Sequence, residues 1–118
     1  MRQAPAIDAF GQGGFRIGGV RHEGSVLILD DAVRPWPVRS MAQLTPAAFA
    51  AAVAAGPGVV EFVLLGTGPA QALPPRVVRD ALQRVGLGLE FMDTAAAAKL
   101  YNYLASEGRR VAAALIAV

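Results

Sequence analysis

Short apolar runs alternate with helical patterns through the second half of the chain. Residues 59–65 are rich in β-branched and large apolar side chains, interrupted only by Glu61, and predict a strand inside a sheet. Residues 87–92 predict a further short strand. Residues 110–118 end in an unbroken apolar run, which predicts a strand buried on both faces. Such a strand is expected in the middle of its sheet.

Three helices are predicted around these strands. Each begins after a capping residue or a proline and ends at or before a glycine, as helices commonly do. They are predicted over residues 46–55, 75–85 and 94–107. The apolar positions with helical spacing form their buried stripes: Phe49 and Val53, then Val78, Leu82 and Val85, then Ala97, Leu100, Tyr101 and Leu104.

The first half has the pattern of short antiparallel strands with glycine turns. Two or three strands are predicted, over residues 15–17, 20–22 and 25–29. Residues 1–11 are expected to be a partly ordered lead-in. Asp30-Asp31 is expected to form a turn. The prolines on either side of Trp36 favour an irregular, extended stretch, with the indole packing over a sheet edge.

The predicted fold class is therefore α/β (α+β), with helices layered on a mixed sheet. A length of 118 residues and an apolar content of 54% fit a single domain over residues 1–118. The longest apolar run, residues 111–118, is shorter than the ~20 residues of a membrane-spanning helix. Arg2, Pro5 and Asp8 do not resemble a secretory signal. A cytoplasmic location is expected.

Composition narrows the possible chemistry. With no cysteine and one histidine, neither a metal nor a cofactor is predicted. The net charge is only +2, and the arginines are scattered rather than gathered beside aromatic residues, so no nucleic-acid partner is predicted. The glycines lack the dinucleotide-binding spacing, and the Gly66-Thr67-Gly68 loop lacks the lysine of a phosphate-binding loop.

No catalytic set emerges from the sequence. His22 and Ser25 are close enough to share a turn, but nothing nearby would orient the imidazole. Glu61 and Glu90 would have to converge to act as an acid–base pair. A structural hydrogen bond or salt bridge is the simpler expectation for each carboxylate. No catalytic residue is predicted, and the protein is not expected to be an enzyme.

The best candidate site is a binding surface. Gly66, Thr67 and Gly68 follow a predicted strand, and loops at the carboxyl ends of strands often bind ligands in α/β folds. Thr94, Tyr101 and Asn102 could add polar groups around an apolar hollow for a small ligand or a peptide. Alternatively, the tyrosine and asparagine satisfy buried backbone groups and hold the loop in place. Both interpretations stay open.

Several short strings carry a family resemblance over almost the whole chain. They are Gly13-Gly14-Phe15-Arg16-Ile17, residues 24–29, Trp36, residues 61–68, Met92-Asp93-Thr94, Tyr101-Asn102 and Glu107-Gly108-Arg109. In them the chain resembles a family of small domains of unknown function that includes the mitochondrial NADH dehydrogenase (complex I) assembly factor three and the adipogenesis-associated domain protein. The resemblance implies a three-layer β/β/α fold, with mixed sheets and about three helices on one side.

One departure from the family pattern limits the chemistry. Many relatives carry a cysteine followed by arginine and threonine before the Tyr-Asn pair, where this chain has Ala98-Lys99-Leu100. A thiol-based activity is therefore not expected. The arginine- and alanine-rich composition, with a single lysine, suggests a bacterial protein from a GC-rich genome.

Three functional hypotheses follow. The first is a non-enzymatic binding or assembly protein that holds a protein partner at a respiratory-chain assembly intermediate, with peripheral membrane association and the oligomeric state left open. The second is a small-molecule-binding domain or weak enzyme that uses the Gly66-Thr67-Gly68 loop. The third treats the shared strings only as determinants of the fold.

Overall fold

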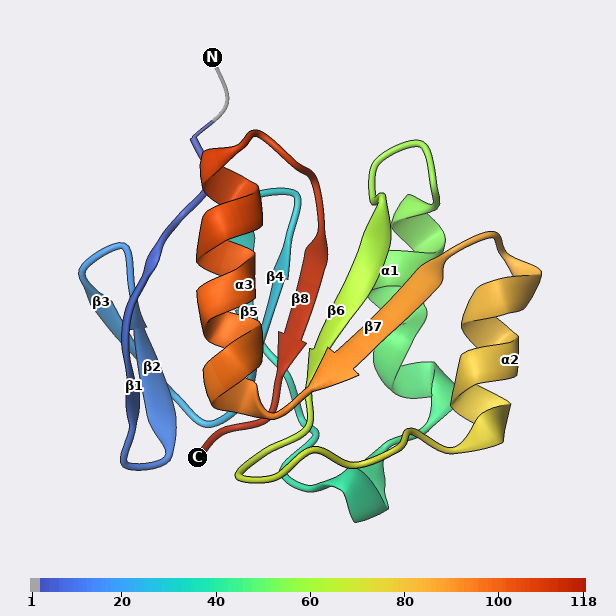
Figure 1. Cartoon of the computed structure of the whole chain (residues 1–118), viewed down its shortest axis with the longest axis horizontal. Helices are drawn as coiled ribbons and strands as arrows, with labels where there is room; N and C mark the ends of the chain where they lie inside the picture. The colour runs from blue at the N-terminus through green and yellow to red at the C-terminus, as the bar shows by residue number, and fades with distance from the viewer. Residues whose placement is uncertain (1–2) are drawn as a thin grey trace.

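A computed structural model describes residues 3–118 and shows two β-sheets in them (Figure 1). The smaller sheet is antiparallel and consists of β1 (Ile7–Gly11), β2 (Gly14–Ile17) and β3 (Val20–Glu23). The larger sheet has, in spatial order, β5 (Ala32–Pro35), β4 (Val26–Leu29), β8 (Ala112–Leu115), β6 (Phe62–Gly66) and β7 (Gly88–Met92). β6 runs parallel to β7 and β8, whereas β4 runs antiparallel to β5 and β8. The larger sheet is therefore mixed.

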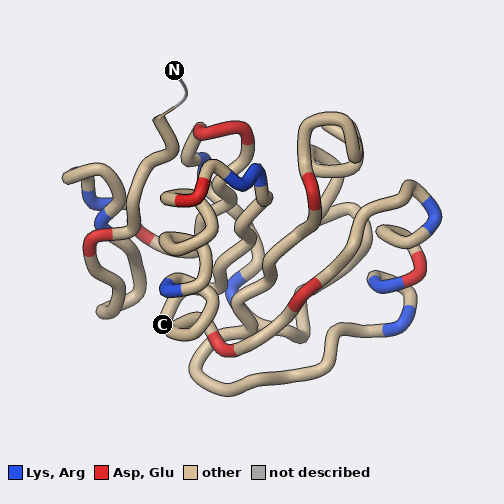
Figure 2. Tube along the Cα trace, turned by 45° about the horizontal axis from the view of Figure 1, so that its top comes forward, with Lys and Arg blue, Asp and Glu red and all other residues tan. Residues whose placement is uncertain are grey.

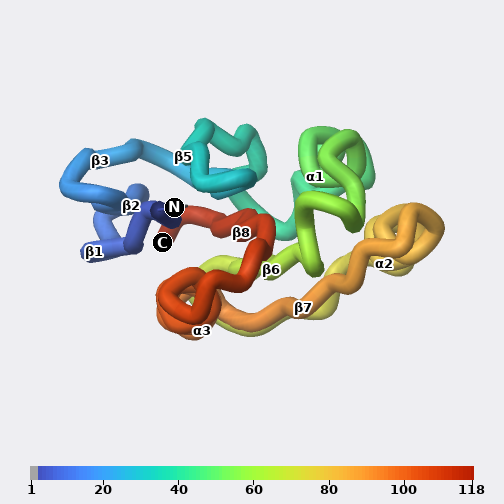
Figure 3. Tube along the Cα trace, turned by 90° about the horizontal axis from the view of Figure 1, so that it is seen from above, coloured from blue at the N-terminus to red at the C-terminus, as the bar shows by residue number. Residues whose placement is uncertain are grey.

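Helices cover both faces of the larger sheet (Figure 3). Two short 3₁₀ turns, η1 (Met41–Gln43) and η2 (Pro46–Phe49), lead into α1 (Ala50–Ala55). α1 and α2 (Arg76–Arg84) pack on one face. α3 (Thr94–Ser106) packs on the other face, beside the smaller sheet. The expectation that the helices share one side of the sheets is wrong.

The reason lies in the strands themselves. In β6, Val63 and Leu65 belong to the core shared with α1 and α2, while Leu64 belongs to the core shared with α3. Successive side chains of a strand point to opposite faces, so a strand that is apolar at every position must be covered on both. All three side chains are fully buried. The strand pattern thus requires cover on each side of β6, and helices provide it on both.

Several sequence predictions are confirmed. The fold class is mixed α/β, and β8 lies in the centre of the larger sheet between β4 and β6. The third helix begins at Thr94, and the Asp93 side chain caps it by accepting a hydrogen bond from the Ala96 N–H at 2.8 Å. Two predicted strands are longer than the observed ones, because residues 59–61 precede β6 and residues 116–118 follow β8.

Two strands are absent from the sequence predictions. Residues 1–11 were expected to be a loose lead-in, yet Ile7–Gly11 is strand β1, paired antiparallel with β2. Residues 1–2 lie outside the described part. The irregular stretch predicted around Trp36 is present at residues 36–37, but the sequence does not predict that the preceding residues Ala32–Pro35 form edge strand β5. A proline is tolerated there because an edge strand leaves one row of backbone groups unpaired.

Asp30 and Asp31 form the turn of the β4–β5 hairpin, as predicted. Asp30 and Asp31 both have positive φ, at 50° and 65°, as the tight turn requires. Trp36 is a core residue rather than a cover for the sheet edge, since only 5% of it is exposed. Its ring meets Phe49 edge-on at 5.7 Å between centroids, and its Nε1–H donates to the Ala48 carbonyl at 2.8 Å.

Within residues 3–118, no helix has the length and apolar character needed to cross a membrane.

Candidate functional site

Thr94, the first residue of α3, joins three segments through one hydroxyl. Its Oγ1 accepts a hydrogen bond from the Gly68 N–H at 3.0 Å and donates to the Ile116 carbonyl at 2.7 Å. The Thr94 N–H in turn donates to the Gly68 carbonyl at 2.9 Å. The residue has no exposed surface. The loop after β6, the start of α3 and the end of β8 are therefore tied together at a single buried side chain.

The rest of the predicted loop is also engaged internally. Thr67 Oγ1 lies 2.7 Å from the Ala70 carbonyl and 3.1 Å from the Met92 carbonyl, and it accepts from the Ala72 N–H at 3.2 Å. Gly66 leaves no room for a side chain, because a Cβ there would lie 2.9 Å from Thr94 Oγ1. The glycine is needed for close packing of the strand end on α3 rather than for an approaching ligand.

Tyr101 and Asn102 hold the N-terminal strand. The Asn102 amide donates to the Ile7 carbonyl at 2.9 Å and its Oδ1 accepts from the Ile7 N–H at 2.8 Å. The Tyr101 hydroxyl donates to the Pro5 carbonyl at 2.8 Å. The two side chains thus satisfy backbone groups, as one interpretation of the sequence expected, but they secure β1 instead of the glycine loop.

The six predicted site residues therefore form two groups. Gly66, Thr67, Gly68 and Thr94 meet at the carboxyl end of β6. Tyr101 and Asn102 lie about two turns further along α3, roughly 10 Å away along its axis, and face β1. The structure does not bring the second group to the loop.

The residues considered for catalysis, His22, Ser25 and Glu61, lie outside the loop after β6. Ser25 Oγ accepts from the Ala117 N–H at 2.9 Å, and His22 lies on β3 opposite Phe15. The Glu61 carboxylate accepts from Arg109 Nε at 2.7 Å and from the Arg110 N–H at 2.9 Å. The predicted structural salt bridge of Glu61 is confirmed.

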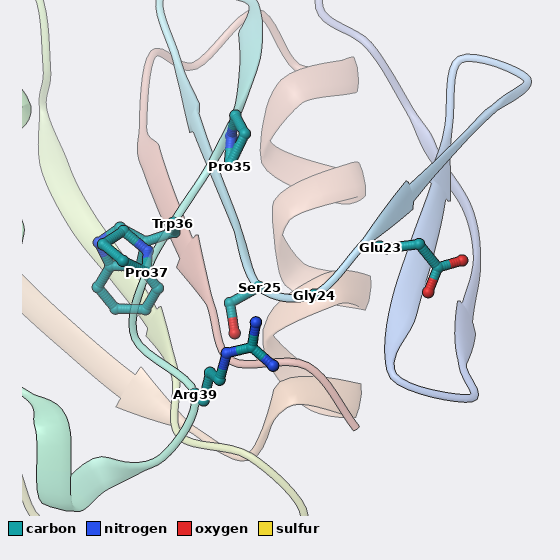
Figure 4. A pocket seen from close by; sticks show the side chains of 7 residues that line it. All are labelled: Glu23, Gly24, Ser25, Pro35, Trp36, Pro37 and Arg39. Atoms are coloured by element: carbon teal, nitrogen blue, oxygen red, sulfur yellow. The ribbon is translucent and has the colours of Figure 1, made fainter.

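The structure shows a hollow that sequence reasoning missed. It has a volume of about 200 Å³ and lies where the chain passes from the smaller sheet to the larger one, beside the end of β5 (Figure 4). Its lining residues are Glu23, Gly24, Ser25, Pro35, Trp36, Pro37 and Arg39. Two segments about ten residues apart meet there because the β4–β5 hairpin aligns them, with the Trp36 N–H donating to the Ser25 carbonyl at 3.0 Å. The prolines around Trp36 were the available signal, since they end the ladder there.

Of the two charged residues that line this hollow, Glu23 is in an ion pair and Arg39 is not. The Glu23 carboxylate accepts from Arg21 Nε at 2.8 Å, and this hydrogen bond lowers the pKa of Glu23 and raises that of Arg21. Arg39 makes no ion pair with any residue of the range 3–118. Over the whole described chain, basic and acidic residues are spread across many elements (Figure 2). No cluster of three metal-ligating side chains occurs among residues 3–118.

The fold and these contacts define a small mixed α/β domain in which two sheets share a core and polar side chains mainly lock segments together. The chain belongs to the family described as "Protein of unknown function (DUF498/DUF598)", which it matches over residues 7–116. The family resemblance predicted from the sequence is confirmed.

Individual relatives agree with this assignment. An uncharacterised protein of Rhodobacter capsulatus is 42% identical over 93% of this chain and 82% of its own length. The bovine NADH dehydrogenase [ubiquinone] 1 alpha subcomplex assembly factor 3 is 36% identical over 98% of this chain, which spans only 64% of that protein. The crystal structure of an outer membrane protein from Bartonella henselae matches with a TM-score of 0.89 and 31% identity, over 98% of this chain and 97% of that one.

Proposed function

We propose that this protein is a non-enzymatic assembly protein that binds a polypeptide partner during the assembly of respiratory complex I. The observation that carries the proposal is the similarity to the bovine assembly factor over 98% of this chain. The similarity includes both sheets and all three α-helices, so it covers the complete core rather than a single motif.

The geometry of the shared strings supports a binding role rather than catalysis. The hydroxyls of Thr67 and Thr94 and the amide of Asn102 all bond to backbone groups of the chain itself. Groups used in this way hold a shape and are not free to act as nucleophile or base. A rigid scaffold of this kind presents its surface loops and strand edges to a partner. The proposal includes a cytoplasmic location and, at most, a peripheral contact with the membrane.

Deletion of the gene in its host tests the proposal. Complex I content on native gels and NADH–quinone activity in membranes are expected to fall, and re-expression of the wild-type chain should restore both. A second respiratory complex on the same gels is the control for general loss of membranes. Unchanged complex I content in the deletion strain would contradict the proposal.

A point variant separates the fold from the function. Asn102→Ala is expected to loosen β1 while leaving the remaining core in place, and the re-expressed variant should restore complex I in proportion to the amount of folded protein in the cell. Immunoblotting of lysates after limited proteolysis, which removes unfolded chains, measures that amount. If the Asn102→Ala variant fully restores complex I although no folded variant protein is detected, a direct role of the protein in assembly is contradicted.

A further inference from the structure

The hollow beside Trp36 contains a buried hydroxyl proton with no acceptor. Ser25 is 3% exposed, and its Oγ accepts from the Ala117 N–H at 2.9 Å. A serine hydroxyl also has one proton to donate, and within residues 3–118 no acceptor takes it. Figure 4 shows the hydroxyl pointing into the hollow, toward Arg39. The oxygen already has one partner in the Ala117 N–H, and the remaining proton is available to an acceptor on a ligand in the hollow.

Arg39 supplies an uncommitted positive charge at the same place. Its backbone N–H donates to Gln43 Oε1 at 2.7 Å, but its guanidinium forms no hydrogen bond or ion pair within the described range. Arg39 and Ser25 both line the hollow (Figure 4). A guanidinium offers paired N–H donors that match the two oxygens of a carboxylate. Together the two side chains form a donor set for one anionic group.

Glu23, the one acid among the described residues that line the hollow, does not compete for this charge. Glu23 is bound to Arg21 at 2.8 Å, and its side chain points away from Ser25 toward the smaller sheet (Figure 4). Arg21 is itself held by Glu23 and by the carbonyls of Gly11 and Gln12. Arg21 and Glu23 carry opposite charges, so together they have almost no net charge. The guanidinium of Arg39 is therefore the unpaired charge among the described residues that line the hollow.

The remaining walls are apolar. Pro35, Trp36 and Pro37 supply ring surfaces without a free N–H donor aimed at the hollow, since the indole N–H is bonded to the Ala48 carbonyl. The volume of about 200 Å³ is below the range typical of drug-sized ligands. A single aromatic ring or a short branched chain is the size of apolar body that fits. One guanidinium and one hydroxyl suit a carboxylate better than a doubly charged phosphate group.

We propose that this hollow binds an organic monocarboxylate with a small apolar body, its carboxylate held by Arg39 and Ser25 and its body packed on Trp36 and the flanking prolines. Two sources have this chemistry: a free small acid and the C-terminal carboxylate of a polypeptide ending in an apolar residue. The inference does not rest on the proposed assembly role, because it concerns the purified chain and a ligand of defined chemistry.

Titration of the purified protein with 3-phenylpropionate tests the inference. Trp36 is the single tryptophan, so its fluorescence reports directly on the hollow, and the ¹⁵N shifts of its indole N–H and of the Ser25 amide report residue by residue. The acid is expected to bind with a Kd of about a millimolar, as its few atoms allow, and to shift these signals. 3-Phenylpropionamide, which has the same body without the charge, is expected to bind at least tenfold more weakly.

Variants assign the binding to the two donors. Arg39→Gln removes an exposed charge and should weaken binding of the acid about tenfold or more, whereas Arg84→Gln removes the same charge on α2 and should change it less than twofold. Ser25→Ala should also weaken binding of the acid. Because this variant also removes the hydrogen-bond acceptor of the Ala117 N–H, its melting curve must first show that the protein is folded. The Arg39→Gln result tests the inference by itself, even if Ser25→Ala does not fold.

A peptide of five residues ending in phenylalanine, with a free or an amidated C-terminus, separates the two sources. Tighter binding of the free-acid peptide than of 3-phenylpropionate supports a polypeptide terminus, and the reverse supports a free acid. The inference is overturned if neither acid binds, if acid and amide bind equally, or if Arg39→Gln binds the acid as well as the wild type does.

Discussion

Asn102→Ala should cost the protein much of its stability, because one side chain satisfies both backbone groups of a residue 95 positions away. Ile7 is 6% exposed, so its N–H and carbonyl would lose their partners in a mostly buried setting. Leaving two such groups unsatisfied costs about 1–2 kcal/mol each, or roughly 2–4 kcal/mol together. Alanine regains about 0.5 kcal/mol through its higher helix propensity. The expected net loss is about 2–3 kcal/mol.

Thermal and urea unfolding followed by circular dichroism measure this loss. For a chain of this size, a destabilisation of 2–3 kcal/mol lowers Tm by roughly 10 °C. Native-state hydrogen exchange should show the location of the effect, with the amides of Ile7–Gly11 exchanging faster than those of Ala112–Leu115. Tyr103→Ala is the matched control on the same helix, because Tyr103 is 61% exposed and its loss should change stability by less than about 0.5 kcal/mol.

Two results would refute the reasoning. The first is a loss for Asn102→Ala no larger than that for Tyr103→Ala, which would mean that the paired hydrogen bonds contribute nothing to folding. The second is a loss of the expected size with unchanged exchange at β1, which would place the effect elsewhere in the molecule.

Three further predictions concern the loop after β6 and the smaller sheet. Thr94→Val should lower the free energy of unfolding by about 2–4 kcal/mol, because it strips two buried backbone groups of their partner, while Thr94→Ser keeps the hydroxyl and should cost less; equal urea midpoints for the two would contradict this. Gly66→Ala should lower Tm because its Cβ meets neighbouring atoms at 2.9–3.0 Å, whereas Gly58→Ala, with open space around its Cβ, should leave Tm nearly unchanged. The pKa of Glu23 is lowered by Arg21, so this pair stabilises the fold at neutral pH and ceases to do so as the pH falls through the lowered pKa. Carboxyl NMR titration should show the pKa of Glu23 rising to its ordinary range in Arg21→Gln, and an unchanged value would show that the pair does not form in solution.

The sequence predicts the fold where a local pattern dictates structure. Residues 112–115 lie within a run of apolar residues, and this alone places them in the centre of a sheet. Strand β1 was missed because Ile7 is held by Asn102 from the far end of the chain, a contact that no local pattern contains. The arrangement of helices on two faces was missed because a fully apolar strand does not tell which helix covers which side.

The same limit applies to the candidate site. Thr94 and Asn102 stood out as polar residues in apolar surroundings, and the structure shows that both are indeed placed to donate and accept hydrogen bonds. A sequence does not tell whether the partner of such a group is a ligand or the backbone. The hollow at Ser25 and Arg39 exists only after the β4–β5 hairpin brings two segments together, so it has no signature in either segment.

The position of β8 has a consequence for the synthesis of the protein. β8 pairs with β4 on one side and with β6 on the other, and it follows both of them in the chain. Until residues 112–115 leave the ribosome, β4 and β6 lack the strand that pairs with both of them in the folded protein. The larger sheet therefore completes only once residues 112–115 have been made, and until then one edge of β4 and one edge of β6 are without their β8 partner.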